Sequence, residues 1–169
     1  WLVLWAGTSS LTPTGKATAP ALNSSSPSYS KLLHCFMNYS QNVKTALSIL
    51  QDEVNGDVAS ALAKMAQDYR MTWMYKSKNE LFPKTGDNIH DELDEVYPIN
   101  GREYDIRNIA EGENVVMIEM IESYPDPETG KVYRTPQVIV LEFKDGLIRT
   151  GRHYCDPSLS YMELTTEQV

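Results

Sequence analysis

The sequence has little of the chemistry that holds metals, nucleic acids or small cross-linked folds. Its 169 residues include only two cysteines and three histidines. Because no Cys-x-x-Cys or His-x-x-x-His pair occurs, we expect free thiols, no metal site and no cofactor. Lys and Arg number 15 against 23 Asp and Glu, which gives a formal net charge of −8. Binding to a phosphate backbone depends on clustered basic residues, so a nucleic-acid partner is not expected.

Long apolar runs are also lacking. Residues 1–5 are apolar, but a bilayer span needs about 20 such residues and a signal peptide needs a longer apolar region, so no membrane span is expected. Residues 7–30 are rich in Ser, Thr, Pro and Ala. We interpret residues 1–38 as an irregular leader, either foreign to the domain or a docking segment that pins its two tryptophans onto a neighbour. The sequence does not decide the compartment, and a cytoplasmic location is slightly preferred.

Helical patterns occupy the first part of the remaining chain. Apolar residues recur at helical spacing over residues 39–54, and Asn55-Gly56 supplies a stop. Asp57 can cap a second helix through Gln67. Residues 69–75 alternate aromatic and Met side chains with polar ones, which favours a half-buried strand. A short third helix is predicted over residues 87–96, before Pro98.

Strand patterns then replace the helical ones. Turn sequences rich in Gly, Pro and Asp separate four candidate strands, which span residues 102–110, 114–124, 132–143 and 147–156. Helices followed by an antiparallel meander predict an α+β fold. We expect a strongly curved antiparallel sheet that wraps around the N-terminal helices as a cone-shaped roll with a pocket. The predicted pocket domain covers residues 39–164, with a C-terminal tail at 165–169.

The turn centres suggest a register for the last three strands. If Tyr124 lies opposite Val132 and Phe143 opposite Leu147, alternation assigns every side chain to one of two faces. The predicted outer face is polar but interrupted by apolar residues too numerous for a solvated sheet, so we expect a homodimer there. These apolar residues are Met117, Ile121, Ile139, Leu141 and Phe143.

The same register predicts one polar constellation on the inner face. It places Glu122, Arg134 and Asp156 in one row across three strands, with Arg102 beside Glu122. One reading is a structural ion-pair ladder at the rim of the sheet, because buried charges persist only when paired. The other is an acid/base array in which Arg134 holds one carboxylate ionised while apolar surroundings raise the pKa of the second.

Two stretches carry a family resemblance. The opening helices with Gly56-Asp57 and Asp68-Tyr69, and the ending Asp-Gly-Leu-Ile-Arg-Thr-Gly-Arg-His-Tyr-Cys-Asp-Pro over residues 145–157, resemble the SnoaL-like branch of the nuclear-transport-factor-two-like superfamily. The resemblance implies a cystatin-like cone of helices against a curved sheet, an apolar pocket and frequent dimerisation through the sheet. Polyketide cyclases, ketosteroid isomerases, scytalone dehydratase and limonene epoxide hydrolase share this fold, as do members without catalysis.

The resemblance also implies a role for Asp156, which stands where cyclase and epoxide hydrolase members carry a catalytic Asp. The Arg-x-Asp pair of limonene epoxide hydrolase is replaced by Met120-Ile121-Glu122, and its Tyr-x-Asn pair by Trp73-Met74-Tyr75.

Two functions follow as alternatives. The first is a cofactor-free acid/base enzyme of isomerase, cyclase, dehydratase or epoxide-hydrolase type, acting on a small hydrophobic oxygenated molecule. Asp156 would be its main acid/base, Glu122 the partner carboxylate, Arg134 the charge organiser and either Tyr154 or Tyr75 a hydroxyl donor. The second is a ligand-binding or assembly module that catalyses nothing. The residues predicted to contact the ligand are Trp73, Tyr75, Tyr104, Met120, Val138 and Arg152.

Overall fold

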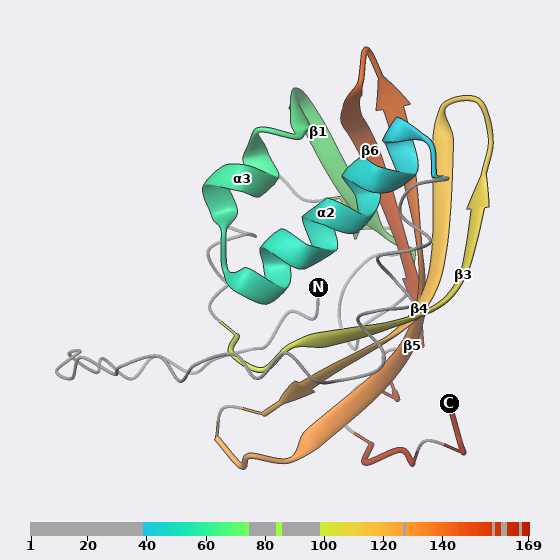
Figure 1. The fold of residues 1–169 in the computed structure, drawn as a ribbon. Coiled ribbons are helices and arrows are strands. Elements are labelled where there is room, and N and C mark those ends of the chain that lie inside the picture. The colour runs from blue at the N-terminus through green and yellow to red at the C-terminus, as the bar shows by residue number, and fades with distance from the viewer. Residues whose placement is uncertain are drawn as a thin grey trace, which may run out of the picture. The chain divides into compact units, whose positions relative to one another are not determined.

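The computed structural model describes residues 39–74, 84–85, 99–126, 128–156, 158–159, 162–165 and 167–169. The chain divides into two units between Tyr39 and Ser40. The second unit contains every helix and strand named below. Figure 1 shows its helices lying against one side of a curved sheet.

Helix α2 (Gln41–Asn55) forms where the apolar spacing predicts it. Its first turn is capped by the Ser40 hydroxyl, which accepts the Val43 N–H at 3.2 Å. It ends at Gly56, whose φ of 69° lies in the left-handed region that glycine adopts without penalty. The buried side of the helix carries the apolar residues of the predicted stripe, together with Glu53. The first predicted helix is therefore confirmed.

Helix α3 (Val58–Leu62) is shorter than predicted. Asp57 caps it as expected, because its carboxylate accepts the Ser60 N–H at 3.0 Å. The prediction that this helix continues through Gln67 is wrong, since Met65 begins a strand. Backbone pairing decides this boundary: Ile148 N–H donates to the Lys64 carbonyl at 2.9 Å, and Met65 lies opposite Ile148. Long-range sheet pairing overrides a local helical pattern here.

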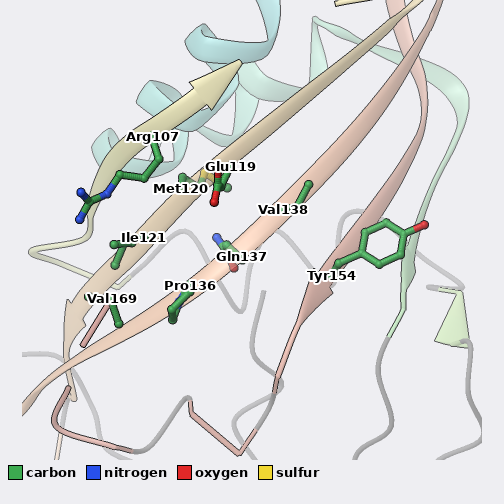
Figure 2. Close-up of a pocket in the computed structure, with 9 residues that line it drawn as sticks. All are labelled: Arg107, Glu119, Met120, Ile121, Pro136, Gln137, Val138, Tyr154 and Val169. Carbon is green, nitrogen blue, oxygen red and sulfur yellow. The ribbon is translucent and has the colours of Figure 1, made fainter. Parts of the chain in front are cut away.

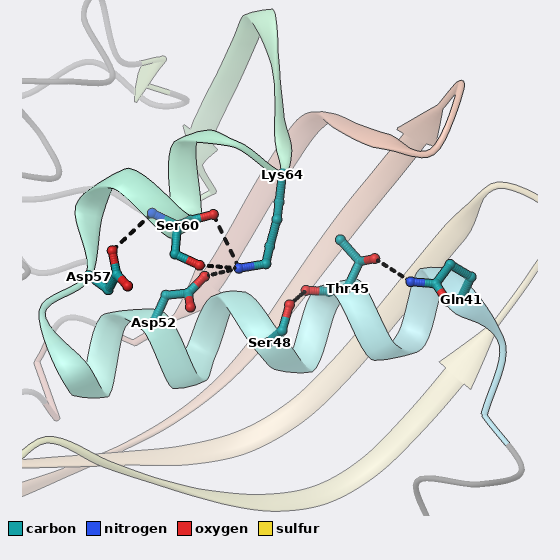
Figure 3. Close-up of polar contacts among 7 residues, drawn as sticks. All are labelled: Gln41, Thr45, Ser48, Asp52, Asp57, Ser60 and Lys64. Atoms are coloured by element: carbon teal, nitrogen blue, oxygen red, sulfur yellow. Dashed lines mark hydrogen bonds and ion pairs between the residues drawn. The ribbon is translucent and has the colours of Figure 1, made fainter.

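A lysine fastens the corner between the two helices (Figure 3). The Lys64 ammonium forms an ion pair with Asp52 of α2. It also donates to the Ser60 carbonyl at 3.1 Å and to the Ser60 hydroxyl at 2.7 Å. Lys64, two residues after the end of α3, thus connects both helices just before the chain enters the sheet.

Within the described residues, six strands form one sheet in the order β2-β1-β6-β5-β4-β3. The four late strands form a consecutive antiparallel meander, as predicted. The strand β1 pairs parallel with β6, so the expectation of an entirely antiparallel sheet is wrong at this pair. The strands are β1 (Met65–Trp73), β2 (Lys84–Thr85), β3 (Glu103–Glu111), β4 (Val115–Pro125), β5 (Val132–Lys144) and β6 (Leu147–Cys155).

The hairpin between β4 and β5 has a different register from the predicted one. Tyr124 lies opposite Tyr133, and Pro125 opposite Val132. The loop is closed by Asp126, whose N–H donates to the Lys131 carbonyl at 2.8 Å and whose carboxylate accepts the Thr129 N–H at 2.7 Å. This shift of one residue exchanges the faces of β5 and β6 relative to β4. The predicted assignment of side chains to faces is therefore wrong for β5 and for β6 from Thr150 onward. Ile148 lies on the inner face as predicted, because a bulge places it opposite Phe143, where Leu147 was expected.

The face of the sheet toward α2 is called the inner face here, and it holds the core. Tyr69, Met71 and Trp73 of β1 are buried at alternate positions, as the pattern predicted. At Gly151 of β6 a side chain would force its neighbours to move, because a Cβ atom would come within 2.8 Å of both the Tyr69 hydroxyl and the Met71 methyl. Further core residues of this face come from β4, β5 and β6: Val116, Ile118, Met120, Tyr124, Ile139, Leu141, Phe143 and Ile148.

The expected dimer surface changes with the register. Ile139, Leu141 and Phe143 belong to the core of this chain, so they cannot form an exposed contact surface. Met117 is 44% exposed on the opposite, outer face. The third predicted helix and residue Tyr75 lie outside the described residues.

Candidate functional site

Polar residues gather at one end of the inner face. The register places Tyr104, Glu122 and Thr135 in one row across β3, β4 and β5. The next row contains Met120, Gln137 and Cys155. Farther along, the rows become apolar, apart from His153. The inner face therefore has a polar end beside an apolar wall, the arrangement that orients an oxygen-bearing apolar ligand.

An arginine joins two carboxylates at this end. Arg102, just before β3, forms ion pairs through Nη1 with Glu53 of α2, at 2.6 Å, and with Glu122 of β4. All three side chains are almost completely removed from solvent. The guanidinium also lies over the Tyr124 ring, 5.4 Å from its centroid. These contacts connect the last turn of α2 to the sheet.

The carboxyl groups of Glu53 and Glu122 share the single guanidinium of Arg102, so the acids outnumber the base in this buried group. Burial lowers the pKa of Arg102, but Glu122 and Glu53 raise it further, so the pKa lies above its ordinary value and the guanidinium stays charged. Burial raises the pKa of Glu53, and Arg102 offsets this only in part. Burial likewise raises the pKa of Tyr104 well above its ordinary value, with Glu53 and Glu122 adding to the effect. Glu53 is thus a carboxyl group poised to hold a proton.

A second buried polar group connects β5 and β6. The His153 ring nitrogen Nε2 lies 2.5 Å from Gln137 Oε1. Burial lowers the pKa of His153 well below 6.5, so the ring is neutral near pH 7. Gln137 Nε2 and Thr135 Oγ1 are also buried, and neither has a hydrogen-bond partner in the described part of the chain. Unpartnered buried polar groups are rare and call for an explanation.

The predicted row of Glu122, Arg134 and Asp156 is not formed. Arg134 lies opposite Ser123 on the outer face and donates to the Leu164 carbonyl at 3.1 Å. Asp156 is exposed after β6, where it accepts from the Ser158 hydroxyl at 2.6 Å and the Ser158 N–H at 2.9 Å, and these bonds lower its pKa. The shifted hairpin is the cause. The prediction of an array organised by Arg134 is wrong.

The other predicted site residues separate into two groups. The pairing of β3, β4 and β5 places Tyr104, Glu122 and Met120 on the inner face. Trp73 lies on the same face, because it is paired with His153. The expected neighbourhood of Arg102 and Glu122 is confirmed by their ion pair. Tyr154, Val138 and Arg152 lie on the outer face and do not contribute to the polar end.

Several inner-face polar residues were not predicted. Glu53 had a signal in the sequence, because an acid three residues after Leu50 falls on the apolar side of the first helix. Thr135, Gln137 and His153 had none, since their faces depend on the shifted hairpin.

The outer face carries a hollow of its own, of about 480 Å³ (Figure 2). It is lined by Arg107, Glu119, Ile121, Val138 and Tyr154, among others, with Val169 at one side. The charged groups around it are largely exposed: Arg107 pairs with Asp105 at 3.0 Å in solvent. Met120 and Gln137, which belong to the inner-face rows, also border the hollow, so it adjoins the buried polar end. The ionisable side chains that line it, Arg107, Glu119 and Tyr154, are exposed.

Comparison with known proteins establishes the fold. No family model matches the sequence, and no curated protein does. Solved structures do match. One is a protein of unknown function with a nuclear-transport-factor-two-like fold from Burkholderia pseudomallei, with a TM-score of 0.58 and 17% identity, covering 73% of this chain and 100% of that one.

Two further matches bear enzyme names. A candidate SnoaL-like polyketide cyclase from Jannaschia has a TM-score of 0.56 and 14% identity, covering 72% of this chain and 93% of that one. An epoxide hydrolase from M. tuberculosis, similar to limonene epoxide hydrolase, has a TM-score of 0.56 and 16% identity, covering 72% and 86%. The chain therefore has the nuclear-transport-factor-two-like α+β fold, and the resemblance seen in the sequence is confirmed at the level of the fold. None of the helices in the described ranges is long and apolar enough to cross a membrane.

Proposed function

We propose that this domain binds a small hydrophobic molecule bearing an oxygen function against the inner face of the sheet and acts on it by cofactor-free proton transfer. The observation that supports this most directly is the Glu53–Arg102–Glu122 group, which buries two carboxylates on one guanidinium beside an apolar wall. A buried carboxyl group with a raised pKa keeps its proton at higher pH than an exposed one, so it can donate that proton to a ligand or take one from it.

The residues take roles different from those expected from the sequence alone. Glu53 is the proposed acid/base, because its pKa is raised by burial. Arg102 is the charge organiser, the role first expected of Arg134, and Glu122, which contacts the same guanidinium, is the partner carboxyl group. Tyr104 contacts both Glu53 and Arg102 and is the candidate hydroxyl donor. Trp73 and Met120 supply apolar surface on the same face.

The fold is compatible with this proposal, since solved structures of the same fold include a candidate cyclase and an epoxide hydrolase. Fold alone does not select a reaction. The alternative, a binding module without catalysis, would use the same apolar wall and would keep the charged group as a structural link between α2 and the sheet.

Proton exchange at carbon provides the test. Small cyclic ketones would be incubated with the protein in D₂O, and deuterium incorporation next to the carbonyl followed by NMR. We expect Glu53→Gln to lower a catalysed rate by roughly 10²- to 10⁴-fold. The matched control is Asp156→Asn, because the Asp156 carboxylate is exposed and is hydrogen-bonded to Ser158. Binding without exchange in the wild-type protein would favour the module. A rate that depends on Asp156 and not on Glu53 would reject the assignment of roles.

We keep the homodimer as part of the proposal, with a corrected surface. Met117 and Tyr154 are exposed large apolar residues of the outer face, and Val138 is half-buried beside the hollow. A Val138→Asp variant should then run as a monomer in sedimentation, because an unpaired charge would be buried at the contact. A wild-type protein that sediments as a monomer at high concentration would exclude this surface as a dimer contact.

A further inference from the structure

The geometry points to Gln137 as the group that binds the ligand's oxygen, with its amide N–H₂ presented by His153 and assisted by the Thr135 hydroxyl. This inference rests on the proposed function, because it names the chemistry of the ligand held at the inner face. The ligand group it selects is a carbonyl or another oxygen that accepts hydrogen bonds.

In the hydrogen bond between His153 and Gln137, the histidine ring is the donor. The two residues lie on the inner faces of β6 and β5, and Nε2 of the ring is 2.5 Å from the amide oxygen Oε1. A carbonyl oxygen only accepts, so the neutral ring carries its hydrogen on Nε2 and donates it. This bond uses the amide oxygen and fixes the orientation of the amide plane.

The amide nitrogen of Gln137 is available to a ligand. With Oε1 occupied, the amide nitrogen of Gln137 is the free end, and it has no hydrogen-bond partner in the described part of the chain although the residue is only 4% exposed. A buried donor without a partner destabilises the folded protein, because it has lost its hydrogen bonds to water. A ligand oxygen bound at Nε2 would remove that cost.

Thr135 supplies a second donor beside Gln137, and apolar residues surround both. Thr135 lies two positions before Gln137 on the same strand, so both side chains emerge on the same face. Its hydroxyl is completely buried and likewise unpartnered among the described residues. The inner-face neighbours Met120 and Ile139 are apolar and buried. Two donors in an apolar wall discriminate strongly for an oxygen, because a ligand without one leaves them unpaired.

The test compares two probes of nearly equal shape, cyclohexanone and methylenecyclohexane, in which a C=CH₂ group replaces C=O. Each is titrated into the full chain labelled with ¹⁵N, and the Gln137 side-chain amide is followed by NMR. We expect cyclohexanone to bind at least about 10-fold more tightly, which corresponds to about 1.4 kcal/mol. We also expect it to shift the Gln137 amide signals.

Variants separate the roles. Gln137→Met keeps the length of the side chain and should abolish the preference for the ketone, and Thr135→Val should reduce it. His153→Leu should lose the preference while still binding methylenecyclohexane, and His153→Gln, which keeps a donor, should restore part of it. Thr150→Val is the matched control for Thr135→Val and should leave the preference unchanged, because the Thr150 hydroxyl is bonded to Glu142 on the outer face.

The outcomes are distinguishable. If both probes bind at the inner face with equal affinity, the role of Gln137 is rejected and the proposed pocket stands. If neither probe shifts any inner-face signal, both the pocket and this inference are rejected.

The tautomer of His153 shows which residue donates in the hydrogen bond between His153 and Gln137, and measuring it needs no ligand or variant. Long-range ¹⁵N–¹H spectra of the wild-type protein should show the hydrogen on Nε2. A hydrogen on Nδ1 would mean that Gln137 donates to His153 and presents its oxygen to the ligand. That result would overturn the inference and would select a ligand donor in place of an acceptor.

Discussion

The two faces of the sheet use similar residue types in opposite ways. On the inner face, Arg102 and its two carboxylates are buried, and on the outer face Arg149 pairs with Asp68 at 3.1 Å with both side chains about half exposed. An exposed pair of this kind contributes little, because water screens it. A buried arginine with carboxylate partners cannot be removed without leaving uncompensated charge. The comparison teaches that position in the fold, more than residue type, decides what an ion pair does.

Removing the arginine from each face should give the largest difference. We expect Arg102→Met to lower the free energy of unfolding by roughly 3–5 kcal/mol, because two carboxylates stay buried without their partner. Arg149→Met should change it by less than about 1 kcal/mol. Urea unfolding at pH 7 measures both. Equal effects of the two variants would show that the buried group is solvated and would remove the basis for the proposed site.

Two neighbours in the sequence sharpen the comparison next. Ile118 is fully buried on the inner face, while Met117 is 44% exposed on the outer face. Ile118→Ala should cost about 2–5 kcal/mol through lost burial and the cavity that remains. Met117→Ala should cost less than about 1 kcal/mol in the monomer, since its side chain loses little buried area. The reverse order in denaturant titrations would mean that the register described here is wrong.

A smaller effect is expected from pH. Because burial lowers the pKa of His153 well below 6.5, the unfolded chain binds a proton at that position more readily than the folded one. Stability should therefore fall as pH drops below about 6.5, by at most about 1.4 kcal/mol per pH unit. The raised pKa of Glu53 acts in the opposite direction at lower pH.

The matched experiment cancels the contribution of Glu53. Unfolding free energies of the wild-type protein and His153→Gln are compared from pH 7.5 to 5. The difference between their slopes isolates His153, and parallel curves would show that the ring titrates normally and is not buried.

The last prediction changes no stability. Burial raises the pKa of the Cys155 thiol to about 11, so less thiolate is present near pH 8. In a Cys35→Ser background, Cys155 should react with iodoacetamide about 100-fold more slowly than a free cysteine at pH 8. Mass spectrometry follows the reaction, and denatured protein serves as the control. Equal rates before and after denaturation would place Cys155 in solvent.

The sequence by itself determined the local elements of this protein. The apolar spacing and the Ser40, Gly56 and Asp57 caps specify the first helix and the start of the second, since capping depends only on nearby residues. The alternating strands and their Gly-rich turns specify the meander of β3 to β6. The neighbourhood of Arg102 and Glu122 was also predictable, because it needs only the hairpin of β3 and β4.

Only the tertiary structure decided the end of α3, the parallel pairing of β1 with β6, and the composition of the site. Met65 leaves its helical pattern because β6, distant in sequence, offers backbone partners. The side chains of β5 and β6 change faces through a shift of one residue at Asp126, which no local propensity fixes. Since side chains alternate along a strand, that shift sends Arg134 and Asp156 outward and brings Gln137 and His153 inward.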